Sequence, residues 1–265
     1  MEQRSTNPTT KQNIIPTLEI CCFNFASLQF MSDLAPVLSI PIRIELCDNQ
    51  HVGGTTPLTI FAPDSSSSAK TISRPRITNA DLEISAMIRP HTISSMGFVY
   101  TPEQFTSMKA DMHLIGETQV ARAFVFGILT QDGKVDEEKC RELMKYADTF
   151  AMGCVFHRAF DEIVHKEEAL EVLVACGFKS VLTSGGPGKA SGDSNCMTLK
   201  RLVDQADGRI EIIVGGGVRS GNLEKLLATG ASAYHSSALV DSGFLCPDVD
   251  EVLAIADIIK RSSIE

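Results

Sequence analysis

Short apolar runs rich in branched side chains recur eight times along the chain, with helical patterns between most of them. The runs are Leu18–Phe23, Ile42–Cys47, Ile84–Arg89, Ala121–Ile128, Ala151–His157, Ser180–Ser184, Ile210–Val214 and Ala233–Ser236. Strands that alternate with helices are joined by crossover connections and therefore lie parallel in one sheet. Eight such units predict an α/β fold in which the sheet closes into a single-domain TIM (β/α)8 barrel.

The helical segments carry signals that mark where they begin and end. They are Pro102–Glu117, Asp136–Ala147, Lys166–Cys176, Asn195–Ala206, Asn222–Thr229 and Asp248–Lys260. Thr101 precedes a proline at a first helical position, and Gly177 and Gly230 follow helices as stops. An open doubly wound sheet is the structural alternative. The chain has no Gly-x-Gly-x-x-Gly motif after its first strand, and eight units favour the barrel.

Three segments interrupt the regular pattern, and they make the early strand–helix connections irregular. Residues 1–16 are predicted to form a flexible N-terminal arm, which leaves residues 17–265 as the barrel domain. The segment Ser32–Pro41 holds two prolines and does not resemble a crossover helix. The long connection Pro57–Ala80 contains a run of four serines and is predicted to be a surface loop with a partly formed helix.

Charge and hydropathy limit the partners that this chain can have. Its formal net charge is −9, whereas nucleic acids and anionic membranes select basic surfaces. No apolar run reaches the roughly 18 residues of a membrane span. The polar residues 1–12 also lack the apolar centre of a signal peptide. We therefore expect neither a nucleic-acid nor a membrane partner, although a local basic pocket remains compatible with a small anion.

Cysteine usage indicates the compartment. Eight cysteines are scattered through the chain without any Cys-x-x-Cys pair, which argues against a structural zinc site. A chain of 265 residues with 43% hydrophobic residues can build a sizeable core without disulfides. We therefore expect a cytoplasmic protein with free thiols.

Alternation in the first two strands predicts which side chains enter the barrel. Glu19 and Cys21 occupy one face of the first strand, and Arg43, Glu45 and Cys47 occupy one face of the second. The alternate positions are apolar except for a cysteine, and they suit the face that is covered by helices. The polar set should therefore point into the barrel.

Buried charges in a barrel are costly unless they are paired. The simplest arrangement sets Glu19 and Glu45 against Arg43 and Arg89. For Glu19 and Arg43, which lie early in their strands, a purely structural ion pair low in the barrel is the alternative. The two thiols and Arg89 lie near the C-terminal strand ends, where the active sites of this fold are found.

Histidines follow two of the strands. The fifth strand ends in His157 and Arg158, with Asp161 three residues later, and the eighth strand contains His235. Such groups at a strand end suit an anion site or acid–base chemistry, with Glu45 and His157 as acid and base. The alternative is that these histidines are hydrogen-bonded rim residues without a catalytic role.

Glycine-rich turns follow the sixth and seventh strands. Barrels of this kind often bind phosphate through backbone N–H groups of the last loops. The residues placed to bind an anion here are Ser184, Gly216, Gly217, His235 and Ser236. Glycine suits a backbone that approaches a ligand closely. Tight turns without a ligand are the alternative.

Eight segments together resemble one known family, in the order in which that family carries them. They are Glu19–Cys22, Arg43–Cys47, Gly53–Pro57, Met87–Pro90, Phe156–Asp161, Val181–Gly185, Gly215–Val218 and His235–Ala238. The chain is similar over roughly residues 17–240 to the CutC copper-homeostasis proteins. The resemblance implies a TIM barrel, a cytoplasmic setting, a role in copper tolerance, and homo-oligomers such as dimers or tetramers.

The resemblance also implies a metal site. The copper ligands proposed in that family fall on Cys21 and Cys47, at the ends of the first two strands. Cu(I) is soft and prefers thiolates. Adjacent strands lie about 4.8 Å apart, so two rim thiols can share one ion. After Arg89 and Pro90 the family usually carries Arg-Gly-Gly-Asp-Phe, and this chain has His91–Phe98 instead, so an acidic and a basic rim residue are missing.

Three functions are therefore open. The first is Cu(I) binding through the two thiols. The second is a lyase- or isomerase-like enzyme that acts on a small anionic or phosphorylated metabolite through Glu45, Arg89, His157 and Arg158, and any effect on copper would then be indirect. The third is an interaction scaffold that has lost its ligand. The many polar residues that point inward favour the first two.

Overall fold

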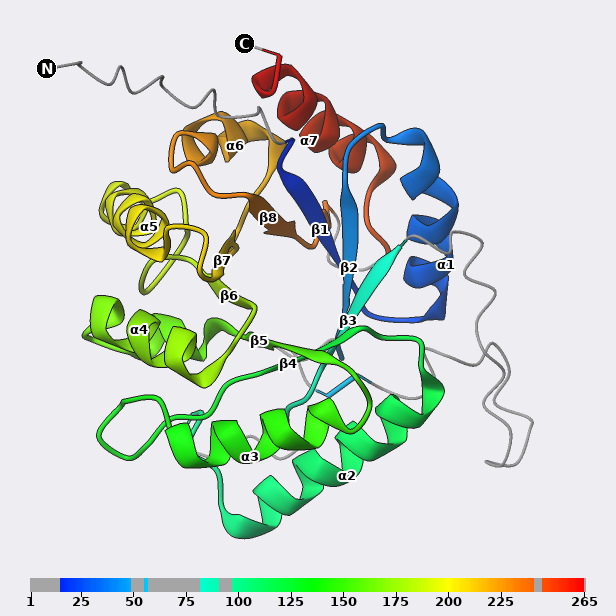
Figure 1. Cartoon of the computed structure of the whole chain (residues 1–265). Coiled ribbons are helices and arrows are strands. Elements are labelled where there is room, and N and C mark those ends of the chain that lie inside the picture. The colour runs from blue at the N-terminus through cyan, green and yellow to red at the C-terminus, as the bar shows by residue number, and fades with distance from the viewer. Residues whose placement is uncertain (1–14, 49–54, 57–81, 91–96, 241–244, 265) are drawn as a thin grey trace, which may run out of the picture.

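The computed structural model describes residues 15–48, 55–56, 82–90, 97–240 and 245–264, and its centre is a closed barrel of parallel strands (Figure 1). The strands are β1 Thr17–Cys22, β2 Ile42–Leu46, β3 Glu83–Met87, β4 Ala123–Phe126, β5 Gly153–Phe156, β6 Ser180–Thr183, β7 Glu211–Val214 and β8 Ala233–Ser236. Strand β1 pairs with β2 on one side and with β8 on the other, and this pairing closes the sheet. The predicted TIM barrel is confirmed.

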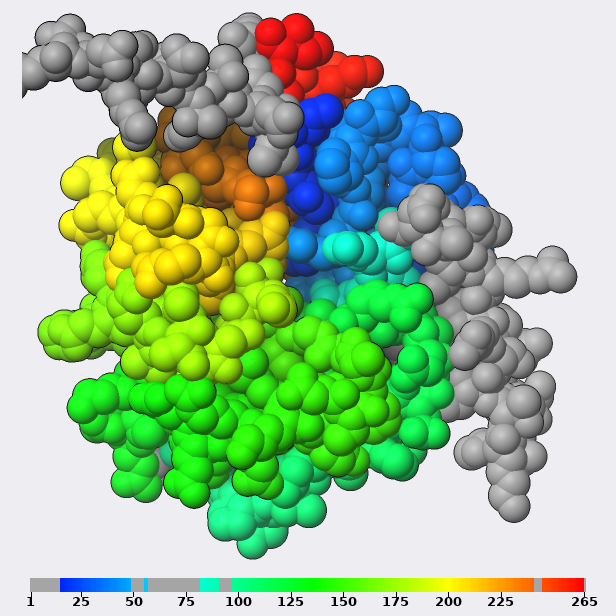
Figure 2. Space-filling view, in the orientation of Figure 1, coloured from blue at the N-terminus to red at the C-terminus, as the bar shows by residue number. Residues whose placement is uncertain are grey.

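Helices surround the barrel as an outer layer (Figure 1). They are α1 Phe25–Leu34, α2 Pro102–Thr118, α3 Glu137–Asp148, α4 Lys166–Cys176, α5 Asp193–Ala206, α6 Ser220–Leu227 and α7 Val249–Ser262. In the space-filling view, α2 to α5 follow one another around the molecule and touch their neighbours (Figure 2). Within the described ranges, no helix combines the length and the apolar character that crossing a membrane requires.

The first crossover contains a helix that the sequence did not predict. Asn24 caps α1, because its side chain accepts a hydrogen bond from the backbone N–H of Ser27 at 2.8 Å, and the Ser27 hydroxyl accepts one from the backbone N–H of Asn24 at 3.1 Å. The helix ends at Leu34 and continues as a 3-10 turn, Ala35–Val37. The prolines of Ser32–Pro41 therefore end the helix, and most of this segment lies outside it, as predicted.

Two predicted segments lie wholly or mostly outside the described residues. The connection Pro57–Ala80 falls within the undescribed range 57–81. Only residues 15 and 16 of the predicted N-terminal arm, residues 1–16, are described. Both stay predictions.

Side-chain direction in β1 and β2 follows the alternation predicted from the sequence. Ile20 and Ile44 are fully buried in the large core between the strands and the helices. Inside the barrel, a second apolar cluster takes residues from or next to all eight strands. Its members are Cys21, Cys47, Met87, Val125, Val155, Leu182, Ile213 and Ala233. The two thiols therefore belong to the interior of the barrel, as predicted.

An ion-pair cluster lies at the start of the strands. The Arg43 guanidinium donates from Nε to Glu19 Oε2 at 2.6 Å and from Nη1 to Glu211 Oε2 at 3.0 Å. Burial acts to raise the pKa of Glu19, but the hydrogen bond from His235 and the charge of Arg43 outweigh it and lower that pKa to about 2. The predicted pairing of Glu19 with Arg43 is confirmed, and Glu211 is a partner that the sequence analysis did not name.

Candidate functional site

A cavity of about 670 Å³ opens where the strands end. Nine of the residues predicted for the site line it: Cys21, Glu45, Cys47, His157, Arg158, Gly216, Gly217, His235 and Ser236. Apolar side chains that were not selected from the sequence form another part of the wall, namely Phe23, Met87, Phe98 and Leu182. The cavity therefore has the position of an active site in this fold.

The thiols of Cys21 and Cys47 meet at the bottom of this cavity. Their Sγ atoms are 2.9 Å apart, which exceeds the 2.03–2.05 Å of a disulfide bond, and both cysteines are free. Both side chains are buried. Cys21 lies in β1, and Cys47 directly follows β2, so the pairing of these two strands sets the two sulfurs side by side.

Burial makes these thiols weak acids. The hydrogen bond with Cys47 and then burial raise the pKa of Cys21 well above its ordinary value. For Cys47, the hydrogen bond with Cys21 acts to lower the pKa, but burial and the charges of Glu45 and Asp48 raise it more, so the pKa rises. Both groups are therefore protonated thiols at neutral pH when no ion is bound.

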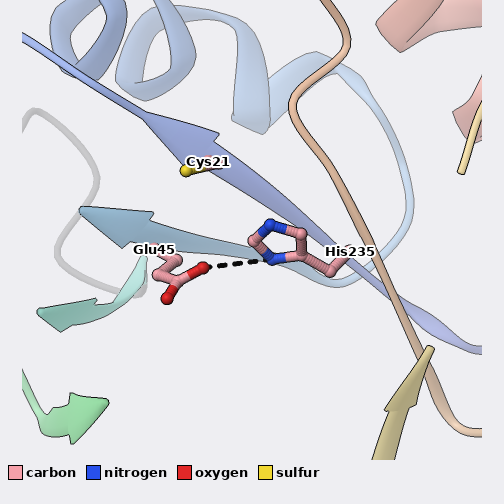
Figure 3. A group of neighbouring side chains, drawn as sticks. All are labelled: Cys21, Glu45 and His235. Atoms are coloured by element: carbon pink, nitrogen blue, oxygen red, sulfur yellow. Dashed lines mark ion pairs between the residues drawn. The ribbon is translucent and has the colours of Figure 1, made fainter. Parts of the chain in front are cut away.

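Cys21, Glu45 and His235 form a group whose possible ligand atoms all lie within 4.8 Å of one another (Figure 3). They come from β1, β2 and β8, which are neighbours in the barrel. His235 Nδ1 lies 2.8 Å from Glu19 Oε1 and 3.3 Å from Glu45 Oε2. The expected arginine partner of Glu45 is thus replaced by a histidine, because β8 closes onto β1.

The charges of this group depend on one another. Burial raises the pKa of Glu45 to about 7, against the opposing effect of His235. Burial acts to lower the pKa of His235, but Glu45 and Glu19 outweigh it, so that pKa is raised. Within the described residues, Glu45 Oε1 has no hydrogen-bond partner although it is buried. Glu45 therefore combines a pKa near neutrality with an uncommitted oxygen at the cavity.

We expect Glu45→Gln to stabilise the protein by about 1–3 kcal/mol at pH 8 and to leave its stability unchanged at pH 4. A raised folded-state pKa contributes stability below the ordinary pKa of a carboxyl group, and this contribution is lost as the pH rises to about 7. Glutamine does not ionise, so it avoids that loss. Urea denaturation of both proteins at pH 4, 6 and 8 measures the difference. If the variant and the wild-type protein were equally stable at all three pH values, the raised pKa of Glu45 would be contradicted.

His157 directly follows β5 and is held in one tautomer. Its Nδ1 accepts a hydrogen bond from the backbone N–H of Ala159 at 3.2 Å, which leaves the proton on Nε2. Burial and then the charge of Arg89 lower the pKa of His157 to about 3, so the ring is neutral. Nε2 is buried and has no partner in the described part of the chain. The ring therefore offers one unused N–H donor.

Asp161 organises the loops after β5 and β6. Its carboxylate accepts hydrogen bonds from Arg158 Nε at 2.8 Å, from the Thr183 hydroxyl at 2.5 Å and from the backbone N–H of Ser184 at 2.9 Å. The Ser184 hydroxyl donates to the same carboxylate at 2.7 Å and is fully buried. Ser184 therefore supports Arg158 from beneath and is not part of the cavity wall.

Arg89 is the second predicted site residue that does not line the cavity. Its side chain is buried, and its guanidinium lies 4.5 Å from the centre of the Phe98 ring. Phe98 in turn lies edge-on to His157, with ring centres 4.9 Å apart. Arg89 is thus placed behind the wall, where its charge lowers the pKa of His157.

The loops after β7 and β8 are tied together by Arg219. Its guanidinium donates to the Ser236 hydroxyl at 3.1 Å and to the Ser237 hydroxyl at 3.0 Å. Gly216 and Gly217 precede it with φ values of 99° and 83°, in the region that favours glycine. Arg219 lies two residues after this glycine run, and that position was the signal by which the sequence could have identified it.

Comparison with known proteins places this architecture in one family. A model of the CutC family matches residues 16–240. The human copper homeostasis protein cutC homolog is 36% identical over 197 residues, which span 74% of this chain and 65% of that protein. A CutC family protein of Chromobacterium violaceum is 36% identical over 83% of this chain and 80% of its own length. The crystal structure of the CutC protein of Streptococcus agalactiae is 29% identical, with a TM-score of 0.67, and the match covers 84% of this chain and 98% of that one. The chain therefore belongs to the CutC family.

Proposed function

We propose that this protein serves copper homeostasis by binding Cu(I) through the thiolates of Cys21 and Cys47. The observation that carries the proposal is the 2.9 Å approach of the two sulfurs at the bottom of the cavity. Cu(I) is a soft ion that selects thiolates over oxygen ligands. Loss of the thiol protons turns a hydrogen-bonded pair into two neighbouring anions, which an ion between them would hold together. Relatives named copper homeostasis proteins support the same conclusion.

His235 is the best candidate for a third ligand. Its Nδ1 faces the carboxylates of Glu19 and Glu45, and carboxylate partners of this kind orient metal-bound histidines. In Figure 3 the other ring nitrogen lies on the side of the ring that faces Cys21. The Glu45 carboxylate is a hard ligand, so it suits Cu(I) less well than the imidazole does. The proposed site is therefore two thiolates with one histidine beside them.

A Cu(I) titration of the reduced protein under anaerobic conditions tests the proposal. Because both thiols have raised pKa values, binding as thiolates releases two protons. The apparent affinity should then fall about 100-fold for each pH unit below neutrality. Competition with a chromogenic Cu(I) chelator at pH 6, 7 and 8 measures this slope. A pH-independent affinity would contradict binding by these thiols.

The cellular setting and assembly belong to the same proposal. All eight cysteines are free, as is expected in the reducing cytoplasm. We propose that location, and we retain homo-oligomers, dimers or tetramers, as a prediction from the family. The absence of nucleic-acid and membrane partners, expected from the net charge of −9, also stays a prediction.

A second candidate function is acid–base catalysis on a small anionic metabolite. Two buried atoms without partners among the described residues support it, namely Glu45 Oε1 and His157 Nε2, and both residues line the cavity. A carboxyl group with a pKa of about 7 suits proton transfer at neutral pH. The neutral His157 ring would donate its Nε2 proton in a hydrogen bond to a substrate oxygen. Glu45 would take a proton from the substrate or return one.

A further inference from the structure

We propose that the rim of this cavity binds the phosphate group of a small phosphorylated metabolite, between the Arg158 guanidinium and the backbone N–H groups of Gly216 and Gly217. This inference deepens the second candidate function, and it rests on that function for the reaction that the bound molecule would undergo. It does not require copper.

Arg158 is fixed in place, yet it keeps unused donors. Its Nε donates to Asp161 at 2.8 Å and its Nη2 donates to the Ser184 hydroxyl at 3.1 Å. A guanidinium carries five N–H groups, so three remain without a partner in the described part of the chain. The side chain is 44% exposed and lines the cavity. A positioned guanidinium with free N–H groups is well suited to the oxygens of a phosphate.

The turn after β7 presents backbone donors next to this guanidinium. A Cβ on Gly216 would lie 3.3 Å from Arg158 Cζ and 2.8 Å from the Cβ of Ser184, so a side chain has no room there. No backbone or side-chain acceptor in the described ranges bonds the N–H of Gly216 or Gly217. Successive free N–H groups in a turn form an anion-binding concavity, and the loop after the seventh strand often has this role in barrels.

Other charged residues near the rim also affect the binding of an anion. The stem of Lys189 lies beside Gly217, since a Cβ there would be 3.4 Å from Lys189 Cγ. Glu162 lines the same cavity and would repel an anion. The carboxylate of Asp161 is already engaged by Arg158, Thr183 and Ser184. Arg158 and the glycine turn therefore keep uncommitted donors that lie next to each other at the rim.

The position of this subsite determines which residues the rest of the ligand would contact. A phosphate at the rim would direct the remainder of the molecule toward Glu45 and His157, whose unpartnered atoms were described above. Phe98 and Met87 supply apolar wall on the way. A cavity of about 670 Å³ has the size of small-molecule sites. The ligand class is therefore a phosphate monoester of a small polar metabolite, with its reactive end at the bottom of the cavity.

Isothermal titration of the metal-free protein with inorganic phosphate at low ionic strength tests the inference. We expect Arg158→Gln to weaken phosphate binding about 10- to 100-fold, because charge-assisted hydrogen bonds are lost. Arg158→Lys should retain part of the affinity. The matched control is Arg201→Gln, which removes a guanidinium that is 63% exposed and paired with Glu167 on the outer helices. It should bind phosphate as the wild type does.

A second variant tests the subsite even if Arg158→Gln disturbs the fold of its own loop. Gly217→Ala meets only the flexible stem of Lys189, and it shifts the backbone N–H because φ is 83°. We expect a loss of affinity of about fivefold or more, together with a cooperative thermal transition. Wild-type affinity in both Arg158→Gln and Gly217→Ala, or an equal loss in Arg201→Gln, would overturn the subsite.

The assay separates this inference from the functions proposed above. It uses no copper, so failure of phosphate binding would leave the Cu(I) titration unaffected. It also involves no turnover. Acid–base catalysis is tested separately, by the exchange of solvent deuterium into dihydroxyacetone phosphate as a probe. If phosphate binds through Arg158 but Glu45→Gln does not slow this exchange, catalysis by Glu45 on that probe is refuted. The phosphate subsite would then still stand.

Discussion

The double variant Cys21→Ser, Cys47→Ser should bind Cu(I) at least about 1000-fold more weakly than the wild-type protein, a difference of about 4 kcal/mol. Serine retains a small polar side chain that can hydrogen-bond at the bottom of the cavity, but its hydroxyl is a hard and very weakly acidic ligand. The fold should survive, because each substitution exchanges one atom in a position where the thiols contact each other. Competition with a Cu(I) chelator under anaerobic, reducing conditions measures the loss.

A matched control removes the same number of thiols elsewhere. Cys176 and Cys196 are partly exposed and lie on α4 and α5, outside the barrel interior. The variant Cys176→Ser, Cys196→Ser should keep the wild-type affinity for Cu(I). Equal losses in the two double variants would show that the ion binds to thiols in general. Wild-type affinity in the Cys21 and Cys47 variant would refute the proposed site.

Arg43→Met should lower the free energy of unfolding by about 3–5 kcal/mol, the largest effect on stability that we expect from a single substitution in this chain. Arg43 binds both Glu19 and Glu211, and the Glu19 side chain is only 4% exposed. Without the guanidinium, Glu19 keeps His235 as its close partner and must either remain charged in an apolar interior or take up a proton. Urea denaturation at pH 7 measures the change.

Two further variants test whether the loss of stability comes from the unpaired charge of Glu19. Adding Glu19→Gln to Arg43→Met removes the uncompensated charge, so the double variant should recover part of the lost stability. Lys200→Met breaks an exposed ion pair with Asp204 and should change stability by less than about 1 kcal/mol. If Arg43→Met were as mild as Lys200→Met, the ion-pair cluster would contribute little to the fold.

Local alternation was enough to predict the direction of side chains in the first two strands. The apolar positions beside Cys21 and Cys47 had to face the helices, so the thiols had to enter the barrel. Their contact at 2.9 Å then follows from the pairing of two consecutive strands. The glycine turn at Gly216 and Gly217 was equally visible, because its sequence is unusual and positive φ values require it.

Contacts between distant segments were not predictable from such patterns. Strand alternation predicted an arginine partner for Glu45, whereas closure of β8 onto β1 sets His235 beside it. Glu211 was not named because its partner Arg43 lies 168 residues away in the chain. Arg89 follows the end of β3, but its guanidinium packs on the ring of Phe98, which lines the cavity, and no local sequence pattern encodes this contact.

The pairing of β1 with β8 also has a consequence for biosynthesis. The two thiols emerge from the ribosome long before His235, because β8 comes much later in the chain than β1 and β2. A nascent chain therefore contains Cys21 and Cys47 long before it contains His235 and the later loops that line the cavity. The grouping of Cys21, Glu45 and His235 can therefore form only after β8 has been synthesised and has docked onto β1.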